Sequence, residues 1–119
     1  MAEITVFHNP RCSTSRHAIA ALADASAEAD VVEYLKTPLK REELIELLDV
    51  LEDPPADLVR KDAHFAKLGL APEHYTTPEQ VADLLVEHPR LMQRPVLRRG
   101  DRAIIGRPKG RVAEFLDIA

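Results

Sequence analysis

The chain has 119 residues, 30% of them charged, and a formal net charge of −4. This length suits a single domain that buries about two thirds of its unfolded surface, and no apolar run is long enough for a signal peptide or a membrane span. The acidic balance argues against general nucleic-acid binding. Cys12 is the only cysteine, which excludes an internal disulfide, so we expect a cytoplasmic protein in a reducing compartment.

The first third of the chain predicts a strand, a helix and a second strand. Residues 4–7 are a β-branched and aromatic run typical of a strand, whereas the alanine-rich residues 18–23 favour a helix. Ser13 or Thr14 is expected to cap that helix. Residues 31–35 predict another strand, which we expect to pair in parallel with the first.

The middle of the chain, residues 37–92, predicts a helical insertion that packs on the sheet. Apolar spacing and proline or glycine stops indicate helical stretches over residues 40–51, 56–60, 62–68 and 77–88. The last of these begins with a capping threonine, Thr77, followed by a first-turn proline and a capping-box glutamine, Gln80.

The end of the chain predicts a hairpin and a final helix. Residues 95–98 and 102–105 read as strands joined by a turn at Gly100. The helix that follows Arg107-Pro108 presents an apolar face of Val112, Phe115, Leu116 and Ile118.

We therefore expect an α/β protein whose mixed β-sheet is built as βαβ and then ββα, from residues 1–36 and 93–119. With a cysteine after the first strand, this order resembles the thioredoxin-like fold. That resemblance places a cis-proline before the third strand, at Pro95.

Cys12 lies where the first strand gives way to the first helix. A lone cysteine is most often a small buried apolar residue. Here, however, the flanking residues are polar, and Arg11, Arg16 and His8 can add positive charge. Free backbone N–H groups at the start of a helix also stabilise a thiolate, so the segment predicts a reactive cysteine with a lowered pKa.

Two familiar cysteine motifs are absent. A C-x-x-C pair needs a second cysteine at position 15, where the chain has Ser15, and the phosphatase loop C-x5-R needs arginine at position 18, where it has Ala18. The histidines lie apart without metal-ligand spacing, so we expect no metal site.

Several motifs together resemble one known family, the glutathione- and glutaredoxin-coupled arsenate reductases. The similarity runs from Glu3 to Ile118 and is carried by His8-Asn9-Pro10-x-Cys12-x-x-Ser15-Arg16, Leu58-x-Arg60-Lys61, His88-Pro89, Arg94-Pro95 and Arg107-Pro108. The resemblance implies that Cys12 is the catalytic cysteine and that His8 and Ser15 assist its ionisation. It also implies three anion-binding arginines, Arg60, Arg94 and Arg107.

The resemblance further implies reduction of arsenate to arsenite. Thiols supply the two electrons by ending as a disulfide, and one cysteine provides only one of the two sulfurs. The resemblance implies that the second sulfur comes from glutathione as co-substrate and that glutaredoxin then removes the glutathione. It implies no bound metal or prosthetic group. The loop departs from the family pattern at Ser13, where glycine is usual, and carries an additional charge at Arg11.

Two other functions fit the same fold. One is a regulator that binds RNA polymerase or another protein, although that group often carries the C-x-x-C pair that is missing here. The other is a monothiol glutaredoxin-like protein, which uses C-x-x-S to exchange glutathione or to hold an iron–sulfur cluster. Its usual glycine-phenylalanine pair is replaced by Ser13-Thr14.

Overall fold

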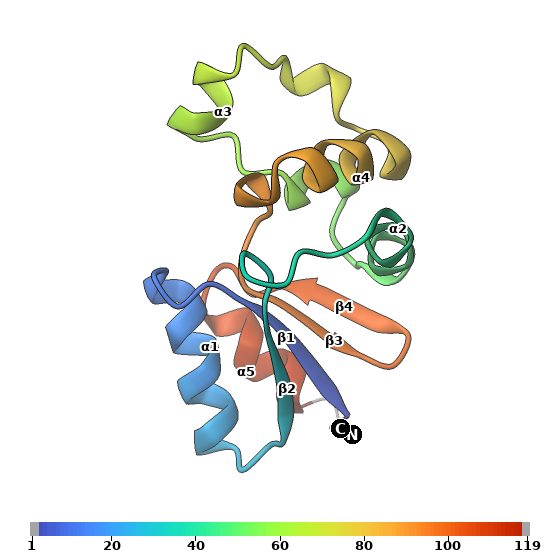
Figure 1. Cartoon of the computed structure of the whole chain (residues 1–119). Helices are drawn as coiled ribbons and strands as arrows, with labels where there is room; N and C mark the ends of the chain where they lie inside the picture. The colour runs from blue at the N-terminus through green and yellow to red at the C-terminus, as the bar shows by residue number, and fades with distance from the viewer. Residues whose placement is uncertain (1–2, 118–119) are drawn as a thin grey trace.

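A four-stranded mixed sheet organises the computed structural model, which describes residues 3–117 (Figure 1). The strands are β1 (Ile4–His8), β2 (Ala29–Glu33), β3 (Val96–Arg99) and β4 (Arg102–Ile105), in the spatial order β2-β1-β3-β4. β1 runs parallel to β2 and antiparallel to β3, and β3 pairs antiparallel with β4. The parallel first pair and the order βαβ, insertion, ββα are as predicted.

Two helices cover one face of the sheet. They are α1 (Ser13–Asp24) and α5 (Gly110–Asp117). Side chains alternate along β1, so Val6 faces these helices whereas Phe7 faces the opposite side. The apolar cluster under the two helices contains Ile4, Val6, Ala18, Leu22, Leu97, Ile104, Val112 and Phe115.

The insertion covers the other face. Its elements are α2 (Arg41–Val50), η1 (Pro55–Leu58), α3 (Ala63–Lys67), η2 (Pro72–His74), α4 (Pro78–Glu87) and η3 (Pro89–Leu91). Leucines of α2 and α4 share one apolar cluster with Phe7, Val96 and Ala103 of the sheet. The chain after α2 also lies along β4, because the Glu52 N–H donates to the Ala103 carbonyl oxygen at 2.8 Å. The insertion is therefore packed against the sheet.

Several predicted details differ from the structure. β2 begins earlier and ends at Glu33, because the Glu33 carbonyl oxygen accepts turn hydrogen bonds from the N–H groups of Lys36 and Thr37. The expected capping role of Ser13 or Thr14 is wrong, since Cys12 itself is the N-cap of α1. The capping role of Thr77 is confirmed, because its side chain accepts from the Gln80 N–H. The turns η2 and η3 were not predicted, and Ile118 lies outside the described residues.

Across residues 3–117, no helix combines the length and the apolar character that crossing a membrane requires. The same part of the chain contains no group of three or more histidine, cysteine, aspartate or glutamate side chains placed to hold a metal ion.

Candidate functional site

Cys12 stands at the junction of β1 and α1 and is only 9% exposed. Its N–H donates to the Asn9 carbonyl oxygen at 3.0 Å, and its own carbonyl oxygen accepts the first helical bond from Arg16 at 2.9 Å. These two bonds close the tight turn that carries Pro10. Because Cys12 is the N-cap, its sulfur lies beside the unpaired N–H groups of the first helical turn.

His8 and Ser15 hold this turn in place. The His8 Nδ1 lies 2.7 Å from the Ser15 Oγ, which also accepts a hydrogen bond from the Asn9 N–H at 3.0 Å. Burial lowers the pKa of His8, and Arg16 adds to this while Glu33 opposes it. The imidazole is therefore neutral near pH 7. The Ser15 and His8 side chains thus join the end of β1 to α1, and Ser15 acts on the sulfur through its backbone N–H.

Arg107 contacts the sulfur directly. Its Nη2 donates to the Cys12 Sγ at 3.3 Å, and its Nε donates to the Arg94 carbonyl oxygen at 2.8 Å. Arg94 ends the segment that leads into β3, and the peptide bond between Arg94 and Pro95 is cis, at the position expected for a cis-proline. The bond between Arg107 and Pro108 is also cis, which the sequence did not indicate.

Arg60 reaches the same place from the insertion. The Arg60 N–H donates to the Leu91 carbonyl oxygen and the Gln93 N–H donates to the Leu58 carbonyl oxygen, each at 2.7 Å. This short antiparallel bridge aligns the chain after η1 with the segment that precedes β3. Arg60 and Arg94 therefore lie together although 34 positions separate them in the sequence. The three arginines matched by the resemblance share one site around Cys12.

The surroundings of Cys12 favour its thiolate. Burial alone raises the pKa of the thiol, but the backbone N–H of Ser15, the guanidinium of Arg94 and the backbone N–H of Thr14 lower it more strongly. The net pKa falls from 9.0 to about 7. Since a difference of one pKa unit corresponds to about 1.4 kcal/mol, this site stabilises the anion by about 2.7 kcal/mol.

The arginines repel one another in the absence of an anion. Burial and the charges of Arg94 and Arg107 lower the pKa of Arg60, against the opposing effects of Asp62 and Cys12. Asp62 forms an ion pair with Arg60 at 3.2 Å, and the buried Arg94 Nε has no hydrogen-bond partner within residues 3–117. An oxyanion placed between the guanidiniums would relieve this repulsion and supply hydrogen-bond acceptors.

A second ion pair supports the loop that carries Arg107. Asp53 accepts from the Ile105 N–H at 2.9 Å and from the Arg111 Nη1 at 2.7 Å. The same Arg111 nitrogen donates to the carbonyl oxygens of Ile105 at 2.9 Å and of Arg107 at 3.4 Å. Sequence reasoning missed Asp53 and Arg111, because no local pattern links two residues 58 positions apart.

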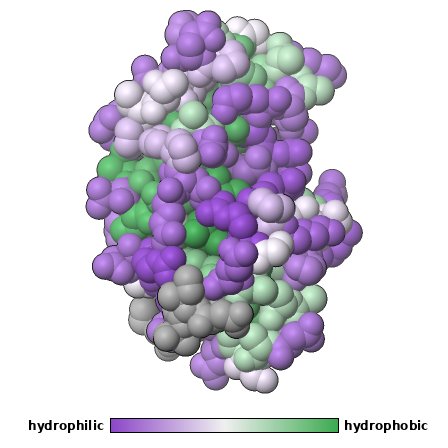
Figure 2. Space-filling model, turned by 180° about the vertical axis from the view of Figure 1, so that it is seen from behind, coloured by the Kyte–Doolittle hydropathy of each residue, from purple (hydrophilic) through white to green (hydrophobic). Residues whose placement is uncertain are grey.

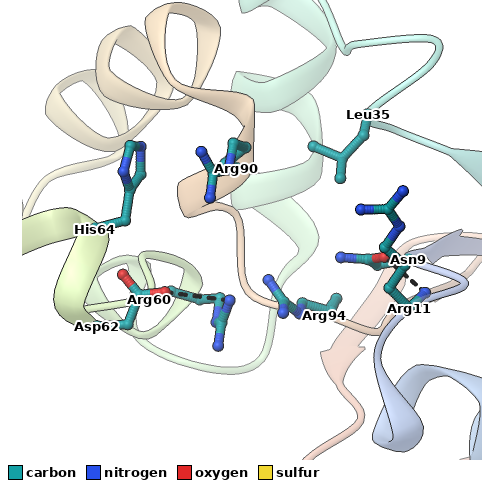
Figure 3. A pocket seen from close by; sticks show the side chains of 8 residues that line it. All are labelled: Asn9, Arg11, Leu35, Arg60, Asp62, His64, Arg90 and Arg94. Carbon is teal, nitrogen blue, oxygen red and sulfur yellow. Dashed lines mark hydrogen bonds and ion pairs between the residues drawn. The ribbon is translucent and has the colours of Figure 1, made fainter.

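A cavity of about 220 Å³ opens beside Arg60 and Arg94. Figure 3 shows its lining, formed by Asn9, Arg11, Leu35, Arg60, Asp62, His64, Arg90 and Arg94. Seen from behind, the molecule is hollowed at one edge between its helical and sheet parts, and mainly hydrophilic residues border the hollow (Figure 2). His64 and Arg90 were not expected to take part in a site.

The chain has relatives in a known protein family. A sequence model of the ArsC family matches residues 7–115. The chain belongs to the ArsC family. It is 32% identical to a protein of Escherichia coli K12 named arsenate reductase, over all of this chain and 84% of that protein. A Neisseria meningitidis protein of the same name is 36% identical over 91% of this chain and 93% of its own length.

Solved structures agree with the family assignment. The structure titled arsenate reductase from Vibrio cholerae superposes with a TM-score of 0.83 at 29% identity, covering 95% of this chain and 97% of that one. The predicted thioredoxin-like α/β class is thereby confirmed. Both the family match and the superposition extend across the helical insertion, so the insertion is part of the family fold.

Proposed function

We propose that this chain reduces arsenate to arsenite, with Cys12 as the nucleophile. The observation that carries the proposal is the buried Cys12 sulfur at a helix N-terminus, with the Arg107 guanidinium 3.3 Å away and Arg94 and Arg60 beside it. Relatives named arsenate reductase at 32% and 36% identity support the choice of oxyanion.

The arginines solve the main electrostatic difficulty of the reaction. Arsenate, like a phosphate group, carries about 1.5 negative charges near neutral pH, and a thiolate that attacks it approaches another anion. Three converging guanidiniums neutralise the substrate and stabilise the charge on its oxygens during attack. Arg94 also lowers the pKa of Cys12, so about half of the thiol is ionised at pH 7 before the substrate binds. His8 and Ser15 hold the turn that aims the sulfur.

The chemistry needs a second thiol from outside the chain. The Cys12 thiolate attacks arsenic and one oxygen leaves as water after taking up protons. Glutathione then displaces another oxygen, again as water, and arsenic is bonded to two sulfurs. The thiolate of glutaredoxin attacks the glutathione sulfur, and the electron pair of that sulfur–arsenic bond passes to arsenic, reducing it from As(V) to As(III). Water releases arsenite and restores the Cys12 thiol.

A coupled assay tests this proposal. We expect arsenate-dependent consumption of NADPH when glutathione, glutaredoxin and glutathione reductase are present, and none with Cys12→Ser. Replacing glutaredoxin with thioredoxin and thioredoxin reductase should abolish turnover. NADPH consumption that is no faster with the wild-type protein than with Cys12→Ser would refute the assignment.

The assay also separates the rival functions. A regulator that only binds RNA polymerase would consume no NADPH with arsenate. A monothiol glutaredoxin-like protein would reduce glutathionylated substrates without any arsenate, and its cluster-binding form would be coloured when purified.

A further inference from the structure

The cavity beside Arg60 and Arg94 holds more positive charge than a single oxyanion requires. Four guanidiniums line it, from Arg11, Arg60, Arg90 and Arg94, against one carboxylate, that of Asp62. Asp62 is already paired with Arg60 at 3.2 Å. Once Arg60 and Arg94 bind the oxyanion, two guanidiniums remain for another ligand.

These two, Arg11 and Arg90, reach the cavity from opposite walls. Arg11 belongs to the turn after β1, and its side chain lies near Leu35, whereas Arg90 belongs to η3 and lies near His64 (Figure 3). No ion pair among residues 3–117 involves the guanidinium of either residue, and neither guanidinium donates a hydrogen bond within that part of the chain. Both are exposed and free to bind a ligand.

Arg94 connects this cavity to the reactive sulfur. Its side chain lines the cavity and also interacts with the Cys12 thiol, so a molecule bound in the cavity lies next to a group that holds the oxyanion. Beyond Arg90 a second hollow follows, lined by Asp62, Ala63, His64, Lys67 and Arg90. The two hollows share Asp62, His64 and Arg90, so Arg90 stands between them.

We propose that Arg11 and Arg90 bind the carboxylates of the thiol co-substrate, and that this cavity is the site of a carboxylate-bearing peptide thiol such as glutathione. The proposal deepens the proposed function and rests on its need for an outside thiol. Glutathione carries its sulfur on the central residue and a carboxylate at each end. With its sulfur toward Cys12, its ends extend to the two walls, where guanidiniums bind carboxylates in a bidentate manner.

Thiol–disulfide exchange on Cys12 tests the proposal without arsenate. Because Cys12 is the only cysteine, it can be loaded as a mixed disulfide with neutral 2-thiopyridine. An attacking thiolate bonds to the Cys12 sulfur, the old disulfide bond breaks, and the released thiopyridone is followed by its absorbance. The attacking thiols are glutathione, glutathione with both carboxylates esterified, and 2-mercaptoethanol.

We expect Arg90→Ala and Arg11→Ala each to slow exchange with glutathione by about fivefold, as for the loss of one partly exposed ion pair. The double variant should lose about 25-fold, because distant contacts add. Rates with the diester and with 2-mercaptoethanol should not change. Arg90→Lys, which keeps the charge but loses bidentate binding, should fall between Arg90→Ala and the wild type.

Arg41→Ala is the matched control, because it removes one exposed guanidinium that pairs with Asp83 and lines neither hollow. It should leave every rate unchanged. An equal loss with all three thiols, the same loss in Arg41→Ala, or no loss in any variant would overturn the proposal. The proposal would also be overturned if Arg11→Ala and Arg90→Ala slowed only the coupled assay at limiting glutaredoxin, because the two arginines would then bind glutaredoxin. If the protein did not reduce arsenate but still exchanged faster with glutathione than with the diester, only the proposed function would be refuted.

Discussion

Replacing Arg94 with alanine should raise the pKa of Cys12. The thiol pKa is about 7 against an ordinary value of 9.0, and the Arg94 guanidinium lowers it both as a hydrogen-bond donor and as a charge. A charge-assisted hydrogen bond contributes about 1.5 kcal/mol, which corresponds to about one pKa unit. Removing Arg94 should therefore reduce the thiolate fraction at pH 7 from about one half to about one tenth.

The rate of alkylation by iodoacetamide measures this directly. The reagent is neutral, so surface charge does not alter its approach, and its rate follows the thiolate fraction between about pH 5 and pH 10. We expect the midpoint to move upward by about one unit in Arg94→Ala and by a similar amount in Arg107→Ala. Arg41→Ala, which removes an arginine paired with Asp83 far from the sulfur, should leave it unchanged. Unchanged midpoints in both site variants would refute the role given to these arginines.

Three further outcomes follow from the same contacts. Because the folded-state pKa of Cys12 is depressed to about 7, the thiolate stabilises the fold above pH 9, and this stabilisation is lost as the pH falls through 7. In urea unfolding, the unfolding free energy of the wild type relative to Cys12→Ser should therefore rise by up to about 2.7 kcal/mol from pH 7 to pH 9. A difference that does not depend on pH would contradict this. Asp53→Asn breaks the ion pair with Arg111 and should lower the unfolding free energy by about 1–2 kcal/mol. Because Arg107 loses its support, arsenate binding should weaken by more than that. An unchanged KM for arsenate in the coupled assay would disprove this supporting role. Gly106→Ala places a Cβ 2.8 Å from the Pro95 Cγ and 3.1 Å from the Val112 Cγ2, so thermal unfolding should show a loss of about 1–3 kcal/mol, and an unaltered melting temperature would mean that the loop adjusts freely.

The sequence predicted those parts of the fold that depend on local chemistry. The helix start at Thr77 follows from its capping hydrogen bond to the Gln80 N–H. The hairpin turn follows from Gly100, whose φ of 61° suits glycine. The capping residue of α1 was mispredicted, because Ser13 and Thr14 carry the preferred side chains whereas the first helical bond closes on the Cys12 carbonyl oxygen.

Residues of the site that meet through the tertiary fold were harder to predict. Arg60 and Arg94 meet because a short bridge joins the chain after η1 to the segment before β3. Only the family resemblance pointed to them. Arg90 and His64 occur in no motif that the sequence offered, and they face the cavity because η3 and α3 pack on neighbouring sides of it. Tyr34, buried with its hydroxyl donating to the Met92 carbonyl oxygen at 3.3 Å, was read only as a strand residue.

Arsenic X-ray absorption on the protein incubated with arsenate tests the central claim most directly. The wild-type protein should show one sulfur bonded to arsenic, in place of one of the four oxygens of free arsenate, before any glutathione is added. Cys12→Ser should show oxygen neighbours alone, and Arg94→Ala with Arg107→Ala should greatly reduce the sulfur signal. An all-oxygen arsenic environment in the wild-type protein at saturating arsenate, above the midpoint of thiol ionisation, would contradict a Cys12–arsenic bond.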